Sequence, residues 1–128
     1  MPQTPKQKLG AWGEEQAVQF LRKEGVEIAE RNFRVKQGEI DIIGWRDLLP
    51  YGRTLCFVEV KTRSNHLESA ERATGKEKLD RLFRAARAYC LFHDVNTDQT
   101  PIRFEQVSVY VNGREEPPTF RHFVIPVD

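Results

Sequence analysis

Apolar residues recur at helical spacing in two segments of the chain. In residues 6–24 the expected apolar face consists of Leu9, Gly13, Ala17, Phe20 and Leu21. In residues 74–93 it consists of Leu79, Leu82, Phe83, Ala86, Tyr89 and Cys90. Gly25 follows the first segment as a stop signal, and the polar stretch NTDQTP ends the second. The spacing therefore predicts two amphipathic helices.

Five other segments have the alternation or the unbroken apolar run that is typical of β-strands. They are residues 28–35, 39–45, 54–62, 102–111 and 119–127. Pro50 and Gly52 mark residues 46–53 as a loop. The run from Leu55 to Val58 is apolar on both sides of its strand, which predicts a central strand covered on both faces.

The order helix, three strands, helix, two strands predicts an α/β fold with a mixed central sheet flanked by helices. The connection after residue 62 passes through a helix, so we expect the strands on either side of it to be parallel and the crossover right-handed. The chain has 128 residues, which is the size of one domain. We expect residues 1–128 to form a single domain, with its core at roughly 7–111.

Composition excludes several classes of function. Hydrophobic residues make up 39% and charged residues 30%, as in ordinary soluble proteins, and the formal charge of +1 gives no global basic field. No apolar run has the length of a signal sequence or membrane span, so we expect a cytoplasmic protein without membrane contact. Cys56 and Cys90 lie in apolar patterns and are expected to be buried, reduced thiols. The scattered positions of His66, His93 and His122 argue against a zinc site.

Two charged residues stand where the central strand is expected to be buried. Glu59 and Lys61 are two residues apart, so they share one face of this strand. Ions removed from water cost several kcal/mol each unless they are compensated. Either the strand emerges into solvent here and the two residues form a weak surface pair, or they belong to a functional site.

Asp41, in the preceding strand, offers a partner for Glu59. Taken alone, it fits ordinary alternation on a solvent-facing side of an outer strand. If the two strands form a hairpin, however, both carboxylates project to one point and repel each other unless a cation lies between them. Mg²⁺ suits such a pair because it retains water, and the backbone carbonyl of Val60 would be a further ligand. Lys61 would then orient an attacking water or stabilise charge developing on a phosphate.

Glu14 is a third acidic candidate and lies in the first expected helix. At about 100° per residue it falls between Val18 and Leu21, inside the apolar stripe. It either extends from this stripe to water or points inward at the same cation, directly or through water. Glu39 shares the side-chain parity of Asp41 and is a lower-ranking alternative, because it adjoins a turn.

Basic residues outnumber acidic ones between residues 61 and 87. The basic residues are Lys61, Arg63, Arg72, Lys76, Lys78, Arg81, Arg84 and Arg87, and the acidic ones are Glu68, Glu71, Glu77 and Asp80. Rows of basic residues such as the one from Lys78 to Arg87 are often solvated helix faces. Beside a metal site, however, such a row would bind phosphates. We expect the polar segment 62–74 to lie at the mouth of the site and to close over a substrate. The sequence has no recognition helix or aromatic platform, which favours contact with backbone or branched shape over base readout.

Several of these segments together resemble a known family. GEIDIIGW followed by FVEVKTR resembles the D-x(n)-E-x-K motif of the restriction-endonuclease-like, PD-(D/E)XK, nuclease superfamily. LGAWGEEQAVQFLRKEG, RNF, GEIDII, FVEVKTR and KEKLDRLFRAARAYC are more closely similar to the bacterial YraN-like family, which is placed near the archaeal Holliday-junction resolvases. The resemblance covers roughly residues 7–111, and the ordered set of motifs is far more specific than a bare D…E-x-K.

The resemblance implies a restriction-endonuclease-like fold and a nuclease that uses Mg²⁺ or Mn²⁺. It implies that Asp41 and Glu59 bind the metal, together with the carbonyl of Val60, and that Lys61 is the catalytic lysine. Glu14 matches the acidic residue of the first helix that often completes such sites.

Nucleic acid is the implied partner, with DNA favoured over RNA. Lys78 matches a basic residue of the helix after the motif strand, and we expect Lys78, Arg63 and Arg81 to face the nucleic-acid backbone. The family pattern commonly has Asp where this chain has Glu105, which puts only an accessory role in question. A junction resolvase would need two sites and hence a homodimer. The alternatives are a non-catalytic nucleic-acid-binding module and an interaction protein that uses the sheet edge or the apolar LLPYG segment.

Overall fold

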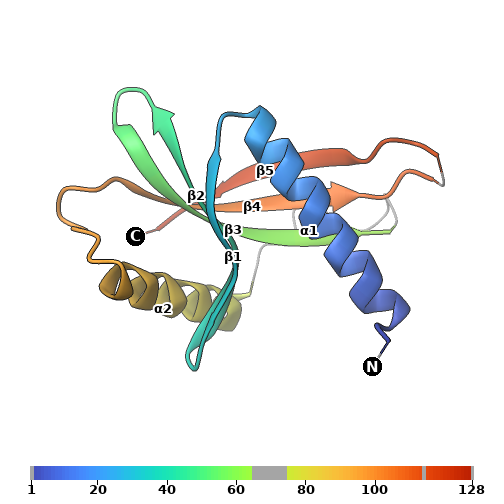
Figure 1. Cartoon of the computed structure of the whole chain (residues 1–128), viewed down its shortest axis with the longest axis horizontal. Coiled ribbons are helices and arrows are strands. Elements are labelled where there is room, and N and C mark those ends of the chain that lie inside the picture. The colour runs from blue at the N-terminus through green and yellow to red at the C-terminus, as the bar shows by residue number, and fades with distance from the viewer. Residues whose placement is uncertain (1, 65–74, 114, 128) are drawn as a thin grey trace.

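The described part of the chain forms two helices and five strands in the predicted order (Figure 1). The computed structural model describes residues 2–64, 75–113 and 115–127. The helices are α1 (Pro5–Lys23) and α2 (Lys76–Phe92). The strands are β1 (Glu27–Val35), β2 (Gly38–Leu48), β3 (Gly52–Arg63), β4 (Ile102–Tyr110) and β5 (Thr119–Ile125).

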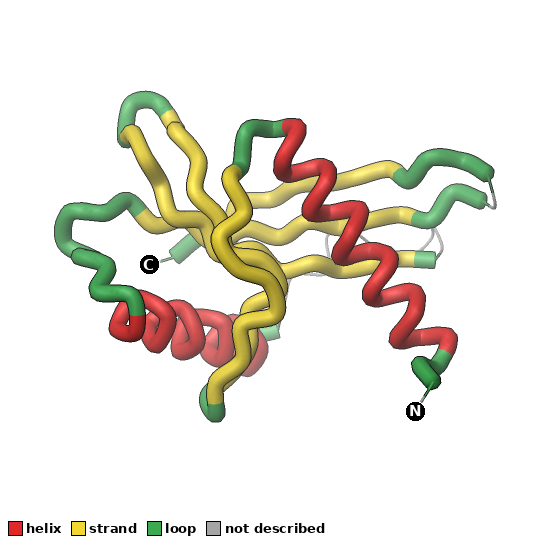
Figure 2. Tube along the Cα trace, viewed as in Figure 1, coloured by secondary structure: helices red, strands yellow, loops and turns green. Residues whose placement is uncertain are grey.

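The strands form one mixed sheet in the order β1-β2-β3-β4-β5 (Figure 2). β3 and β4 run parallel, with Leu55 opposite Ile102, and α2 lies in the connection between them. Every other neighbouring pair is antiparallel. The predicted α/β fold, the parallel crossover and the central position of β3 are therefore confirmed.

The two helices pack on opposite faces of the sheet, and each covers its own core. On one face, Val18 and Leu21 of α1 pack in a cluster with Val58. On the other face, Leu82 of α2 packs in a cluster with Phe57. Phe57 and Val58 are neighbours on β3, and both are fully buried. Coverage of both faces explains the unbroken apolar run in this strand.

The hairpin that joins β2 and β3 is longer than predicted. The sequence predicts a loop over residues 46–53, but Leu48 pairs with Gly52, which leaves only a tight turn. Gly52 has a φ of 85°, a conformation that glycine adopts without strain. The guanidinium of Arg53 lies 5.4 Å from the ring centre of Trp45, so polar strand residues are held by cross-strand neighbours. The loop prediction was wrong because turn residues mark a reversal of the chain without fixing its length.

Other boundaries differ by one or two residues. α2 ends at Phe92 rather than residue 93, and β5 ends at Ile125 rather than residue 127. The expected helix start at residue 74, and most of the polar segment expected at the mouth of the site, lie outside the described residues. Cys56 and Cys90 are buried and unpaired, as predicted. Within the described ranges, no helix is both long and apolar enough to cross a membrane.

α1 approaches β3 closely at Gly13, where a Cβ atom would overlap the side chain of Thr62. Gly10, one turn earlier, has open space around it. We expect Gly13→Ala to lower the free energy of unfolding by about 1–3 kcal/mol, because packed atoms must shift. We expect Gly10→Ala to raise it by up to about 1 kcal/mol, because alanine favours the helix. Urea denaturation of both variants tests this prediction, and equal stabilities would contradict it.

Candidate metal and catalytic site

The candidate site lies where β2 separates from β3, beyond the last pair of these strands, Ile42 and Val58. We call this point of separation the fork. The β2–β3 pairing extends only to Ile42 opposite Val58, whereas β2 continues to pair with β1 as far as Gly38. In Figure 1 the end of the β1–β2 hairpin turns away from β3 and toward α2. A Cβ atom on Gly38 would overlap the backbone carbonyl of Arg81, so this glycine lets the hairpin rest directly on α2. The separation opens a space between two strands that are otherwise adjacent.

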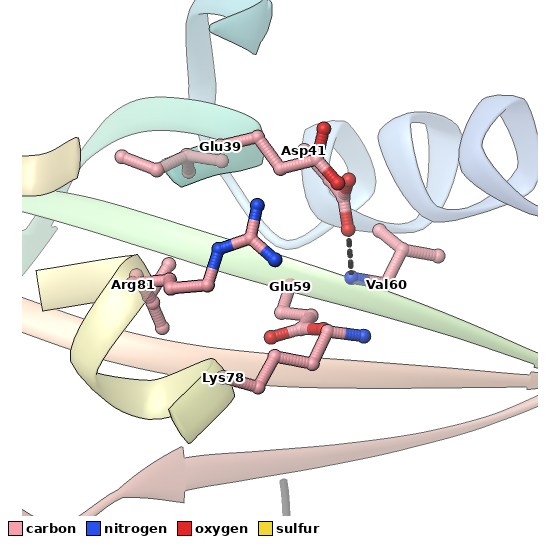
Figure 3. A pocket seen from close by; sticks show the side chains of 8 residues that line it. Glu39, Asp41, Glu59, Val60, Lys78 and Arg81 are labelled. Atoms are coloured by element: carbon pink, nitrogen blue, oxygen red, sulfur yellow. Dashed lines mark hydrogen bonds and ion pairs between the residues drawn. The ribbon is translucent and has the colours of Figure 1, made fainter. Parts of the chain in front are cut away.

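Asp41 lies at the point of separation. Its Oδ2 accepts a hydrogen bond from the backbone N–H of Val60 at 2.8 Å (Figure 3). Burial, followed by the negative charges of Glu59, Glu14 and Glu39, raises the pKa of Asp41 to about 6, and the Val60 hydrogen bond only partly opposes this. Three further carboxylates are therefore close enough for Asp41 to sense their charge. Asp41 therefore lies in a locally negative environment.

Glu59 comes from β3 and is almost completely buried, with 7% of its side chain exposed. Its Oε1 lies 2.6 Å from Nζ of Lys78, in the first turn of α2. Such burial rules out the weak surface pair with Lys61 that the sequence left open. The ion pair with Lys78 was missed from the sequence, because it depends on where α2 docks after the crossover.

Lys61 follows Glu59 on β3 and is half-buried. Burial lowers the pKa of Lys61, as do the positive charges of Lys78 and Arg63, while Glu59 opposes the shift. Arg63 is the last residue of the same strand and is also half-buried. The expected catalytic lysine is thus close enough to Glu59 to sense its charge and lies in a partly dehydrated environment, but it lines neither of the two hollows at Asp41.

Glu14 faces β1 rather than bulk water, with 14% of its side chain exposed. Its Oε1 accepts a hydrogen bond from Nδ2 of Asn32 at 2.8 Å and lies 3.4 Å from Nε of Arg31. Asn32 has a φ of 53°, a left-handed conformation that asparagine tolerates better than most residues. The contact with Asn32 was not predicted, and the only hint was that Asn32 belongs to the RNF segment. Glu14 therefore lines the site while two side chains of β1 hold its carboxylate.

Two hollows meet at Asp41, one on the side of each helix. Both are lined by Glu39, Asp41 and Val60. The hollow beside α2 has a volume of about 170 Å³, and its other lining residues are Ile40, Glu59, Lys78, Arg81 and Leu82. The hollow beside α1 has a volume of about 510 Å³, and its other lining residues are Lys6, Leu9, Gly10, Glu14, Asn32, Arg34, Thr62 and Ser64. A ligand can therefore approach Asp41 from either side of the sheet.

The donor atoms at the fork suit a hard divalent cation, because they are carboxylate oxygens with partly uncompensated negative charge. In residues 2–64, 75–113 and 115–127, no three acidic, histidine or cysteine side chains already form a metal-binding group. Two of the candidate ligands are held elsewhere, since Glu59 contacts Lys78 and Glu14 contacts Asn32. Metal binding would therefore require side-chain movement, with Asp41 already in place.

The basic residues of α2 divide into two groups. Lys78 and Arg81 line the hollow beside Glu59, and Figure 3 shows Arg81 extending between Asp41 and Glu59. Arg84 and Arg87 are exposed and do not line either of these hollows. Only the first part of the predicted basic row therefore belongs to the site.

Comparison with known proteins identifies the family. The profile of the uncharacterised protein family UPF0102 matches residues 13–109, which is most of the chain. The chain belongs to the UPF0102 family. The resemblance to the YraN-like family is confirmed at this level. The family match spans the second half of α1 and the chain from β1 into β4, and it includes Glu14, Asp41, Glu59 and Lys61.

Relatives in several bacteria support the UPF0102 assignment. A UPF0102 protein of Koribacter versatilis is 43% identical over 111 residues, covering 82% of this chain and 70% of its own. One from Syntrophomonas wolfei is 38% identical and covers 82% of this chain and 92% of its own. One from Caldicellulosiruptor saccharolyticus is 41% identical and covers 87% and 89%. This UPF0102 chain is therefore similar to these relatives over more than four fifths of its length.

Proposed function

We propose that this protein is a divalent-metal-dependent nuclease of the PD-(D/E)XK superfamily that hydrolyses phosphodiester bonds. The observation that carries the proposal is that Asp41 and Glu59 line the same hollow at the fork, with Lys61 two residues after Glu59. This is the arrangement that the D-x(n)-E-x-K motif implies. The raised pKa of Asp41 supports it, because negative charge gathered in a buried place calls for a cation.

Asp41, Glu59 and the backbone carbonyl of Val60 would hold Mg²⁺ or Mn²⁺, with Glu14 acting directly or through water. When bound, such an ion supplies Lewis acidity to a phosphoryl oxygen and lowers the pKa of a coordinated water. Asp41 is held in its position by the Val60 N–H. Lys78 contacts Oε1 of Glu59, so the ion would compete with Lys78 for this oxygen.

The positive side chains at the fork account for phosphate binding. Lys61 shares its face of β3 with Glu59, and there its ammonium group would orient the attacking water and stabilise charge on the phosphate. Lys78 and Arg81 belong to α2 and line the hollow beside it. Arg63 lies at the end of β3. These three side chains would contact the nucleic-acid backbone. Contacts to the backbone do not distinguish one base from another, which favours recognition of structured or branched DNA by its shape.

Two other functions compete with this proposal. A non-catalytic nucleic-acid-binding module would have no need for carboxylates near its phosphates, because the two repel each other. An interaction protein is favoured by one observation, the exposed apolar tip of the β2–β3 hairpin. There Leu49 is 98% exposed and Tyr51 is 72% exposed. Neither alternative requires a divalent cation.

Cleavage of labelled nucleic acids in the presence of Mn²⁺ tests the proposal. The panel comprises single-stranded, duplex, flap and four-way-junction DNA, with matching RNA strands. We expect wild type to cleave at least one substrate and Lys61→Met to lower the rate by about 100-fold, as when a charge-stabilising donor is removed. Lys23→Met, an exposed change at the opposite end of α1 from Lys6, is the control and should leave the rate unchanged.

Equal cleavage by Lys61→Met and wild type would remove Lys61 from the reaction. Absence of cleavage on every substrate, together with metal-independent DNA binding, would favour the binding module. Absence of both activities would favour the interaction protein, and the hairpin tip would then be the first surface to test.

A further inference from the structure

The buried carboxylate of Glu59 has an unusual counter-ion. Its partner Lys78 comes from a different element, across the crossover, and holds Oε1 at 2.6 Å. The two side chains differ greatly in exposure, since 59% of Lys78 is exposed against 7% of Glu59. Glu59 is fixed in the wall of the cavity, whereas Lys78 reaches it from solvent on a flexible four-carbon stem. One member of the pair can therefore leave without disturbing the core.

We propose that Lys78 is an exchangeable internal counter-ion, which neutralises Glu59 in the metal-free protein and is displaced to a substrate phosphate when the divalent cation binds. This inference rests on the proposed function, because it assumes that Glu59 is a metal ligand. It adds a regulatory role for Lys78: metal binding and nucleic-acid binding become coupled through one side chain.

The geometry places Lys78 in direct competition with the cation. A divalent ion between Asp41 and Glu59 needs an oxygen of Glu59, and Lys78 is in contact with one of these oxygens. Lys78 and Asp41 line the same cavity of about 170 Å³, so two cations in it would repel each other. The metal could also bind Asp41. Lys78 forms no ion pair with Asp41 in the described structure. A divalent ion held by both residues would therefore make two carboxylate contacts where Lys78 makes one.

Other groups that face the pair do not substitute for Lys78. Lys61 lies on the same strand as Glu59, but it does not line the cavity, and in the part of the chain that the structure describes it forms no ion pair with Glu59. Arg81 lines the cavity and extends toward the space between the carboxylates, but within the described residues it forms no ion pair with them. Lys78 is thus the cation whose position depends directly on Glu59.

Displacement would give Lys78 a second position. The released ammonium group would remain at the mouth of the cavity, beside Arg81, where it would bind a phosphate of the substrate. Coupling between two ligands is reciprocal at equilibrium. A divalent cation should therefore tighten nucleic-acid binding, and nucleic acid should tighten metal binding, both through Lys78. A lysine that only contacts phosphate would leave metal affinity in the absence of nucleic acid unchanged.

The first experiment measures Mn²⁺ affinity without nucleic acid at pH 8, by following free Mn²⁺ with electron paramagnetic resonance. We expect Lys78→Met to bind Mn²⁺ about five- to tenfold more tightly than wild type, because the competitor is gone. Lys78→Arg keeps the charge and should remain close to wild type. Lys76→Met is the matched control, since Lys76 is exposed, lies in the same turn and forms no ion pair in the described structure. Equal or weaker Mn²⁺ binding by Lys78→Met would overturn the inference.

The second experiment measures binding of fluorescent four-way-junction DNA by anisotropy, with and without Ca²⁺ as a divalent ion that suppresses turnover. We expect Ca²⁺ to tighten binding several-fold in wild type and Lys76→Met, and to lose this effect in Lys78→Met. An undiminished Ca²⁺ effect in Lys78→Met would overturn the coupling. Absence of Mn²⁺ binding in wild type would overturn the proposed function itself, whereas equal binding in wild type and Lys78→Met would overturn only the role of Lys78.

Discussion

Replacement of Asp41 by asparagine is expected to stabilise the metal-free protein at pH 8 and to abolish its response to Mn²⁺. Asparagine keeps an oxygen that can accept the Val60 N–H and removes the charge that the neighbouring carboxylates repel. The same change removes a metal ligand, so we expect cleavage to fall by at least about 100-fold. Loss of activity together with a gain in stability separates a functional carboxylate from one that supports the fold.

The pH dependence of this gain follows from the pKa of Asp41, which is about 6 in the folded protein. In the unfolded chain an aspartate titrates near 3.9, so the folded state binds the proton more tightly. The stability from this proton is full below about pH 4 and is lost as the pH rises through 6. We therefore expect Asp41→Asn to gain about 1–3 kcal/mol at pH 8 and close to nothing at pH 4.

Urea denaturation in EDTA at the two pH values measures the effect. Asp47→Asn is the control, because Asp47 is exposed in the β2–β3 hairpin, and its change should stay within about 0.5 kcal/mol. Destabilisation of Asp41→Asn at pH 8 would show that the carboxylate serves the fold. Retention of Mn²⁺ binding by the variant would remove Asp41 from the metal site.

Replacement of Glu105 by glutamine is expected to destabilise the protein by about 3 kcal/mol at pH 7. Glu105 lies on β4 with no exposed surface, although it is charged. His122 of β5 contacts its Oε1, and Nε of Arg103 lies 3.5 Å from its Oε2. Glutamine fills nearly the same volume but leaves the positive charge of Arg103 without a counter-ion at the edge of the core. The cost is therefore electrostatic rather than steric.

The stability contributed by Glu105 should disappear in acid. Burial alone would raise the pKa of Glu105, but hydrogen bonds from His122 and Cys56 and the charges of His122 and Arg46 outweigh it and lower the pKa. A depressed pKa gives stability that is present above the unfolded value of about 4.3 and is lost as the pH falls below it. Urea midpoints of wild type and Glu105→Gln should thus converge in strong acid, with exposed Glu115→Gln as the control. Parallel pH profiles would contradict the role of the charge.

The fold and the acidic pair could be predicted because both depend on local sequence patterns. The alternation in β2 and the apolar run in β3 identify the strands, and a short connection makes the two strands neighbours. Just beyond the end of their pairing, Asp41 and Glu59 line the same hollow. The length of the hairpin was mispredicted because Pro50 and Gly52 mark the reversal, while Arg46 and Asp47 extend the ladder through backbone pairing.

The remaining contacts could not be predicted because they join elements that are distant in sequence. Lys78 reaches Glu59 only because α2 docks against the end of the β1–β2 hairpin, where Gly38 admits the Arg81 carbonyl. Glu105 and buried Val107 are two residues apart on β4 and point to the same face of the sheet, which is a sign of burial in the sequence. That His122 is the partner of Glu105, however, depends on the register between β4 and β5. Which charged side chains contact each other therefore depends on long-range packing.

The order of the chain also has a consequence for folding. Asp41, Glu59 and Lys61 all belong to one antiparallel hairpin closed by a tight turn, so little loop entropy opposes their assembly. The parallel pairing of β3 with β4 requires closure of the whole segment that contains α2, and such non-local pairing forms slowly. The mutually repelling carboxylates can therefore come together in the hairpin before Lys78 arrives with α2. In this order of events Glu59 gains its counter-ion only when the crossover helix docks.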